Sequence, residues 1–132
     1  LRPLDHPISM NSHDISYRPA TDWEKSQMSL EYTTDSYFIE GFIHCSTYEQ
    51  TIPIANQFYK HQSDLLLLLI DETLLNPHCK WENSYPHVYS PIPLKAIIQV
   101  YNFLPNSHGI FHFRQTSYFR LFYGDNLLTN II

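Results

Sequence analysis

The stretch "DLLLLLID", Asp64 to Asp71, constrains the fold of this chain more than any other. Every residue from Leu65 to Ile70 is apolar, and a charged residue stands at each end of the run. A short apolar run of this kind predicts a strand that is covered on both faces, as in the middle of a sheet. It is far too short to cross a bilayer, which takes about 20 apolar residues in a helix. We therefore expect a sheet-centred core and no membrane as partner.

The composition indicates one globular domain, residues 1–132. Apolar residues make up 43% of the chain and charged residues only 16%, unlike the polar bias of disordered sequences. The formal charge is -5 and the basic residues are scattered, so no surface for a nucleic-acid partner is indicated. The first residues lack the basic start and the apolar stretch of a signal peptide, which predicts a cytoplasmic protein with reduced Cys45 and Cys79.

A change from strand to helix is predicted within "IEGFIHCSTYEQTIPIANQFY", Ile39 to Tyr59. Glu40 to Ser46 alternates well enough for a strand, and the apolar residues after it recur at helical spacing. A hydroxyl residue at the junction is placed to cap the helix, and a longer polar side chain three residues on is placed to complete a capping box. The candidates for these two positions are Ser46 or Thr47 and Glu49 or Gln50.

The alternation of the predicted strand separates two sets of side chains. Ile43 and Cys45 point to one face and are expected in the core. His44 and Ser46 point to the other face, beside the start of the helix, where free backbone N–H groups favour an anionic ligand group. The alternative is that His44 is a structural histidine with satisfied hydrogen bonds and that Ser46 is merely a cap.

The rest of the pattern predicts a mixed α+β domain with two short helices early and a strand-rich C-terminal half. A helix is expected from Trp23 to about Leu30, with a capping residue just before it. The tail from Gly109 alternates aromatic and polar residues, which predicts one or two further strands. Short strands are also expected at Cys79–Glu82 and within 85–93, and a longer strand is expected at Ala96–Phe103.

Five motifs follow one another along the chain: "DWEKSQ", "EGFIHCSTYEQTIPIANQFY", "DLLLLLID", "KWEN" and "YPHVYSPIPLKAIIQVYNF". In order and approximate spacing they resemble the domain of unknown function 952 family. The resemblance covers about residues 15–103 and leaves residues 104–132 as an aromatic C-terminal extension. That family is grouped by fold with ADP-ribosyltransferases, and "GFIHCSTYEQTIPIANQFY" looks like the strand and helix of diphtheria-type toxins.

The resemblance implies an ADP-ribosyltransferase-like split antiparallel β-sheet with a cleft for NAD or a related nucleotide. It leaves open whether the protein is a transferase and whether it has a protein acceptor. No metal is expected, since the sequence contains neither CxxC nor HExxH spacing. The implied catalytic residues are His44 and His87, and the implied ligand-binding residues are Ser46, Thr47, Trp23, Glu40, Gln50 and Tyr89.

Two departures from the family pattern favour the alternative of a catalytically inactive module that binds a ligand or a protein. Family members usually begin with a histidine that would bind ribose in the transferase fold, whereas Ser16 or Tyr17 stands at that place unless His13 replaces it. Toxin-type transferases also need a late glutamate, which stabilises the positive charge that develops as nicotinamide leaves. The comparable strand offers His87 and Tyr89 instead.

Overall fold

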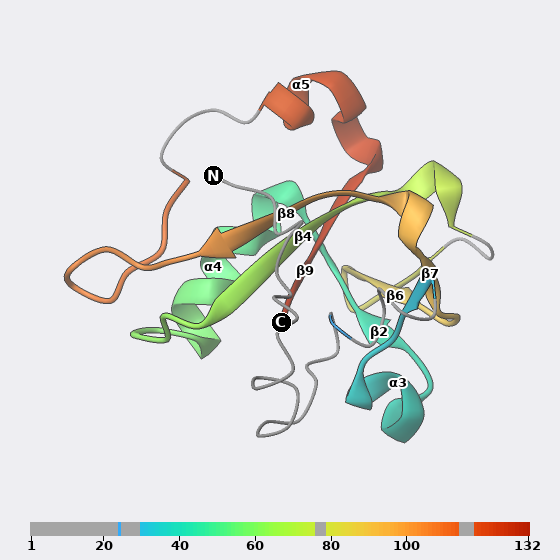
Figure 1. Ribbon diagram of the computed structural model, residues 1–132, viewed down its shortest axis with the longest axis horizontal. Coiled ribbons are helices and arrows are strands. Elements are labelled where there is room, and N and C mark those ends of the chain that lie inside the picture. Colours follow the sequence, from blue (N-terminus) through green and yellow to red (C-terminus); the bar gives the residue numbers. More distant parts are fainter. Residues whose placement is uncertain (1–23, 25–29, 76–78, 114–117) are drawn as a thin grey trace, which may run out of the picture.

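A computed structural model of the chain describes Glu24 and residues 30–75, 79–113 and 118–132 (Figure 1). The predicted helix from Trp23 to Leu30 lies almost entirely outside the described residues. The described part is α+β, with antiparallel strand pairs and few helices.

The main sheet has four strands in the order β3 (Ser46–Thr47), β9 (Leu127–Ile131), β4 (Leu65–Asp71) and β8 (Ile97–Phe103). The strand predicted from the apolar run is confirmed as β4, which pairs with β8 on one side and with β9 on the other. Its alternate residues enter two separate cores. Leu68 and Ile70 belong to one buried cluster, and the odd-numbered leucines of β4 belong to the other. Burial on both faces explains why every position of this strand is apolar.

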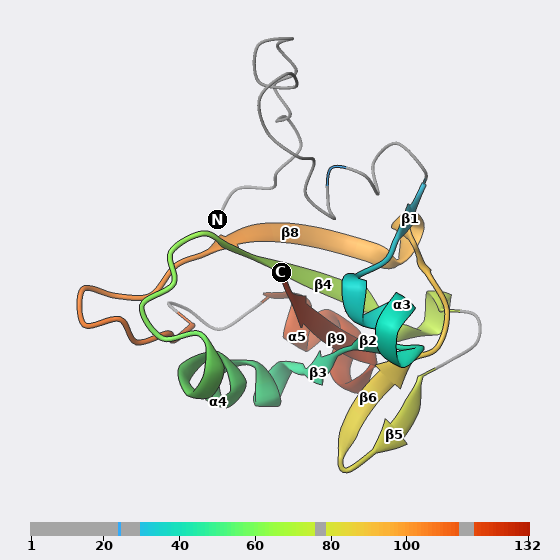
Figure 2. The same cartoon turned by 90° about the horizontal axis from the view of Figure 1, so that it is seen from below.

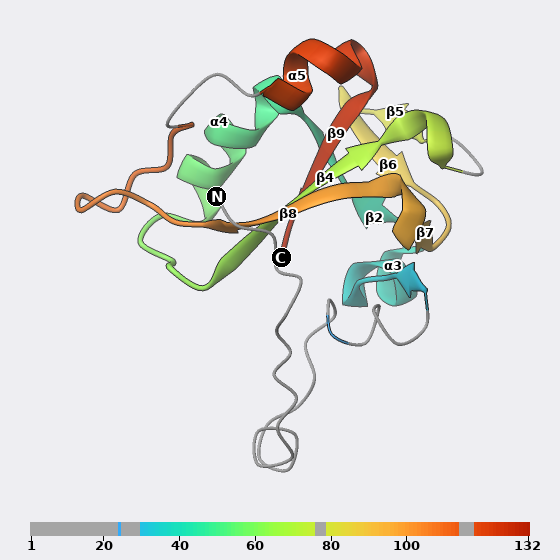
Figure 3. The same ribbon diagram turned by 45° about the horizontal axis from the view of Figure 1, so that its top comes forward.

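Two smaller antiparallel sheets lie beside the main one. One has the order β2 (Ile43–His44), β6 (Tyr85–Val88) and β5 (Lys80–Glu82), and the other pairs β1 (Glu31–Tyr32) with β7 (Ile92–Pro93). These confirm the strands expected near Cys79–Glu82 and within 85–93. In Figures 1 to 3, helix α4 (Tyr48–Phe58) and the β5–β6 hairpin lie on either side of β9.

The continuous strand predicted from Glu40 to Ser46 is wrong. Helix α3 (Asp35–Glu40) occupies the preceding segment and ends at Gly41, whose φ of 92° is the left-handed conformation that glycine adopts without steric cost. The strand starts only at Ile43 and breaks at Cys45, so that β2 joins β6 while β3 joins β9. This break divides one sequence motif between two sheets.

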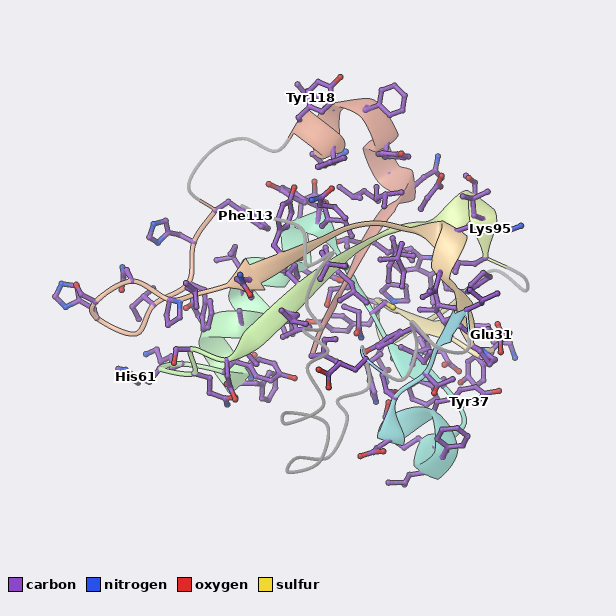
Figure 4. All side chains as sticks on the ribbon, viewed as in Figure 1. Glu31, Tyr37, His61, Lys95, Phe113 and Tyr118 are labelled. Atoms are coloured by element: carbon purple, nitrogen blue, oxygen red, sulfur yellow. The ribbon has the colours of Figure 1, made fainter. Side chains whose placement is uncertain are left out.

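The strands predicted for the aromatic tail are correct only for its last residues. Helix α5 (Tyr118–Tyr123) stands where aromatic and polar residues alternate, and β9 follows after a turn of 3-10 helix (Gly124–Asn126). Two more such turns occur at Glu72–Leu74 and Leu94–Ala96. Figure 4 shows Tyr118 on the outer side of α5, where it is exposed. In the described residues, no helix is long and apolar enough to cross a membrane.

Both cysteines are free thiols; Cys45 belongs to one core cluster and Cys79 packs against it. Cys45 is buried, as its place in the predicted alternation requires, and burial raises the pKa of its thiol far above the ordinary value. The pKa of Cys79 is raised to about 12, first by burial and then by Glu72, whose carboxylate accepts a hydrogen bond from Cys79 Sγ at 2.9 Å. Neither thiol has the lowered pKa that a nucleophilic cysteine needs.

Candidate functional site

A cavity of about 510 Å³ opens where the main sheet meets the β2–β6–β5 sheet and helices α3 and α4. Its volume lies within the range of small-molecule sites, roughly 300–1,000 Å³. Both polar side chains and aromatic or aliphatic side chains line it. The lining residues fall into five groups along the chain: 34–36, 44–46, three residues of α4 and its C-cap (Ile54, Phe58, Tyr59), Tyr85 with His87, and 129–132.

Two histidines form the polar centre of the cavity wall. His44 in β2 and His87 in β6 are directly opposed in the antiparallel register, so their side chains lie on the same face. Their ring centroids are 5.3 Å apart with the planes at 72°. The side chain of His44 is 53% exposed and that of His87 is 13% exposed. Phe42 stacks on the His87 ring at 4.1 Å, which fixes the plane of that ring.

Each imidazole is held by a carboxylate. His44 Nε2 lies 3.0 Å from Glu40 Oε2, at the end of α3, and His87 Nδ1 lies 2.7 Å from Glu82 Oε1. Tyr89 donates a hydrogen bond to the same Glu82 oxygen at 2.5 Å. The hydrogen bonds from Tyr89 and then from His87 lower the pKa of Glu82, so its carboxylate stays ionised at neutral pH.

These carboxylates decide which imidazole nitrogens remain for a ligand. Because a carboxylate accepts the N–H bond, it fixes the tautomer and the orientation of each ring. Within the described part of the chain, no hydrogen bond engages His44 Nδ1 or His87 Nε2. The site therefore offers two oriented imidazoles, each with one nitrogen still able to accept or donate a proton.

The C-terminal strand β9 holds this arrangement together. Asn130 is buried; its Nδ2 donates to the His44 carbonyl at 2.6 Å, and its Oδ1 accepts from the Tyr32 hydroxyl at 2.7 Å. Thr129 contacts the Thr51 hydroxyl of α4 at 2.7 Å. Both Thr129 and Asn130 also line the cavity. Sequence reasoning missed these residues, and the one available signal was the polar pair interrupting the final apolar stretch, "NLLTNII".

The structure brings together part of the predicted site. His44, Ser46 and His87 line the same cavity. Glu40 and Tyr89 are not among the described lining residues, but Glu40 contacts His44 and Tyr89 contacts the carboxylate of Glu82. Trp23 lies outside the described residues.

Thr47 and Gln50 are not among the described lining residues. They form the capping box of α4: Gln50 N donates to Thr47 Oγ1 at 3.1 Å, and Thr47 N donates to Gln50 Oε1 at 2.9 Å. Their polar atoms satisfy the helix terminus, and a ligand contact of either residue stays a prediction. Within α4 and its C-cap the cavity is lined by Ile54, Phe58 and Tyr59, and an anionic ligand group at the start of α4 stays a prediction.

Replacement of Thr47 by alanine is expected to lower the free energy of unfolding by about 1 kcal/mol, because the first turn of α4 loses its side-chain cap. Urea denaturation followed by circular dichroism measures this loss. The matched variant Thr47→Ser keeps the capping oxygen and should retain most of the stability. A serine variant as unstable as the alanine variant would contradict the capping role.

Among the described residues, no group of three or more His, Cys, Asp or Glu side chains is placed to hold a metal ion. The carboxylates nearest the two histidines each contact one imidazole in hydrogen-bond geometry. The two imidazoles can supply hydrogen bonds and proton transfer.

Comparison with known proteins identifies the family. The profile of the family described as "Protein of unknown function (DUF952)" matches residues 17–100. The chain belongs to the DUF952 family. The family match includes His44 and His87 but ends before β9, so Thr129 and Asn130 are added by a segment beyond it. No curated protein matches the chain.

Two solved structures resemble this DUF952 protein. Both are of protein CC0527 from Caulobacter crescentus, at 24% identity and, for a double mutant, at 23% identity. For each comparison the TM-score is 0.61, and the match covers 69% of this chain and 85% of the CC0527 chain. At this level of identity the likeness shows a shared fold and nothing about activity.

Proposed function

We propose that the cavity binds a nucleotide, NAD or a close relative, in an ADP-ribosyltransferase-like fold. The observation that carries the proposal is the pair of oriented imidazoles, His44 and His87, in the wall of one cavity of suitable size. Their unengaged nitrogens are suited to hydrogen-bond phosphate or ribose oxygens. The division of the strand motif between two antiparallel sheets agrees with the split sheet that the sequence resemblance implies.

The other lining groups fit the remaining parts of a nucleotide. The hydroxyl group of Ser46 supplies a hydrogen-bond donor for phosphate oxygens, whereas Thr34 and Ser36 are hydrogen-bonded to each other and Ser36 donates to the Phe42 carbonyl. The Asp35 carboxylate is an acceptor for ribose hydroxyl groups. Phe58 and its aliphatic and aromatic neighbours offer an apolar wall for a flat base.

The carboxylates argue against ADP-ribosyl transfer as the activity. Glu40 and Glu82 are not among the described lining residues, and each is engaged by a histidine. A glutamate that stabilises the charge on ribose as nicotinamide leaves must face the substrate. We therefore favour nucleotide binding without ADP-ribosyl transfer.

Isothermal titration calorimetry with NAD and with ADP-ribose tests this proposal. We expect saturable binding and a raised melting temperature, since a ligand present at about 100 times its Kd stabilises the folded state by about 2.7 kcal/mol. Replacement of His44 by alanine should weaken binding at least about tenfold, the effect of losing one hydrogen bond to a charged group. The exposed His112 provides the matched control, and His112→Ala should bind as the unaltered protein does. Absence of binding and of stabilisation at millimolar NAD would overturn the proposal.

A further inference from the structure

The two histidines line one cavity and differ in which ring nitrogen a carboxylate engages. Glu40 engages the Nε2 atom of His44, whereas Glu82 engages the Nδ1 atom of His87. The rings are 5.3 Å apart between centroids, so both can contact the same phosphate group. Histidine is the side chain best suited to accept and donate protons near neutral pH. The arrangement is that of a proton-transfer pair with each ring pre-oriented by its own carboxylate.

The charges of the cavity wall indicate which class of phosphate ester the cavity favours as a ligand. Asp35 is the one lining side chain with a fixed charge in the described part of the chain, and that charge is negative. A phosphate monoester carries close to two negative charges at neutral pH, which this wall would neutralise poorly. A phosphodiester carries one negative charge, so it meets less repulsion than a monoester does from Asp35 and from the carboxylates of Glu40 and Glu82 that contact the two imidazoles. The wall therefore favours a phosphodiester over a terminal phosphate.

From these observations we infer that the cavity hydrolyses a phosphodiester within a nucleotide, of the class of nucleoside 2′,3′-cyclic phosphates, with His44 and His87 as the proton-transfer pair. This inference rests on the proposed nucleotide binding and adds a reaction to it. In such a substrate the leaving O2′ would lie near one imidazole and the attacking water near the other, on the opposite side of the phosphorus atom. Phe42, stacked on His87, keeps that ring in place through the reaction.

The reaction consumes one water molecule. One neutral imidazole accepts a proton from the water as the water oxygen forms a bond to phosphorus. The P–O2′ bond breaks with its electron pair on O2′, and the second imidazole, which is protonated, donates its proton to that oxygen. The product is a nucleoside 3′-phosphate. The two histidines have then exchanged protonation states, which they recover by exchange with solvent, and no oxidant or other reactant is needed.

The test uses the full-length protein and adenosine 2′,3′-cyclic phosphate as the probe. Binding is measured by calorimetry and cleavage by phosphorus NMR, in which the cyclic ester and the monoester give separate signals. We expect cleavage by the unaltered protein and a fall in kcat at saturating substrate of about 10²- to 10⁴-fold in His44→Ala, the usual contribution of one general acid or base. His87→Ala should behave likewise. His44 is half exposed, so its alanine variant serves if His87→Ala fails to fold. His112→Ala is the control with unchanged kcat.

Three results would overturn the inference. Binding of the cyclic nucleotide without cleavage refutes the reaction while leaving nucleotide binding intact. Cleavage that persists in His44→Ala and His87→Ala refutes the assignment to this pair and points to a contaminating activity. Failure of both NAD and the cyclic nucleotide to bind refutes the reaction and the proposed function together.

Discussion

Replacement of Leu128 by alanine is expected to lower the free energy of unfolding by about 2–5 kcal/mol, the range measured for large-to-small changes in protein cores. Leu128 is fully buried in the same cluster as Leu68 and Ile70 of the neighbouring strand. It also pairs with Thr47 on one side and with Ile70 on the other. A cavity at this position loosens the middle of the main sheet.

The control for this prediction is Leu121→Ala, since Leu121 lies on α5 and is 79% exposed. Surface substitutions usually change stability by no more than about 0.5 kcal/mol. Urea denaturation of both variants gives the comparison, provided that the dependence on denaturant is the same for each. Equal losses in the two variants would show that β9 is not a central strand.

Replacement of Asn130 by alanine is expected to reduce stability and ligand affinity together. The buried side chain links the Tyr32 hydroxyl to the His44 carbonyl. Loss of these hydrogen bonds removes support from both groups, at a cost of about 1–3 kcal/mol for a buried polar group left without its partner. Because β2 loses the contact that fixes the His44 backbone, NAD binding should also weaken, as calorimetry would record.

Asn102→Ala is the matched control, because Asn102 lies on β8 with its side chain exposed. That variant should keep both stability and binding. If Asn130→Ala lost stability but bound NAD as tightly as the unaltered protein, Asn130 would support the fold alone and the link to the site would be refuted.

Sequence patterns predicted the elements that are determined by residues close together in the chain. The apolar run at Leu65–Ile70 appears as β4, and the hydroxyl and amide at Thr47 and Gln50 form the capping box expected of that spacing. The alternation also placed Ile43 and Cys45 inside and His44 outside correctly. In each case a residue and its nearest neighbours along the chain determine the outcome.

Such patterns could not predict the pairing of strands that lie far apart in the sequence. The last strand, Leu127–Ile131, enters the middle of the main sheet between segments more than 50 residues earlier, and nothing in its own sequence specifies that place. The pairing of His44 with His87 likewise depends on the register of β2 against β6. The sequence motifs include both histidines, but only the register of β2 against β6 shows that they are neighbours.

The break in the predicted strand has a similar cause. Glu40 and Gly41 read as the start of a strand, yet Thr34 accepts a hydrogen bond from Tyr37 N and caps a short helix that ends at Gly41. This helix brings Glu40 to His44, four residues later, within hydrogen-bond distance. A local cap therefore created one of the two carboxylate–histidine contacts of the site.

The most direct measurement is a titration with NAD followed by NMR of the imidazole groups, which reports on each of the 8 histidines separately. We expect the signals of His44 and His87 to shift together and to saturate at one ligand concentration, while those of the exposed His108 and His112 stay in place. Saturable shifts confined to histidines outside the cavity, or no shifts at millimolar NAD, would contradict a nucleotide site built on this histidine pair.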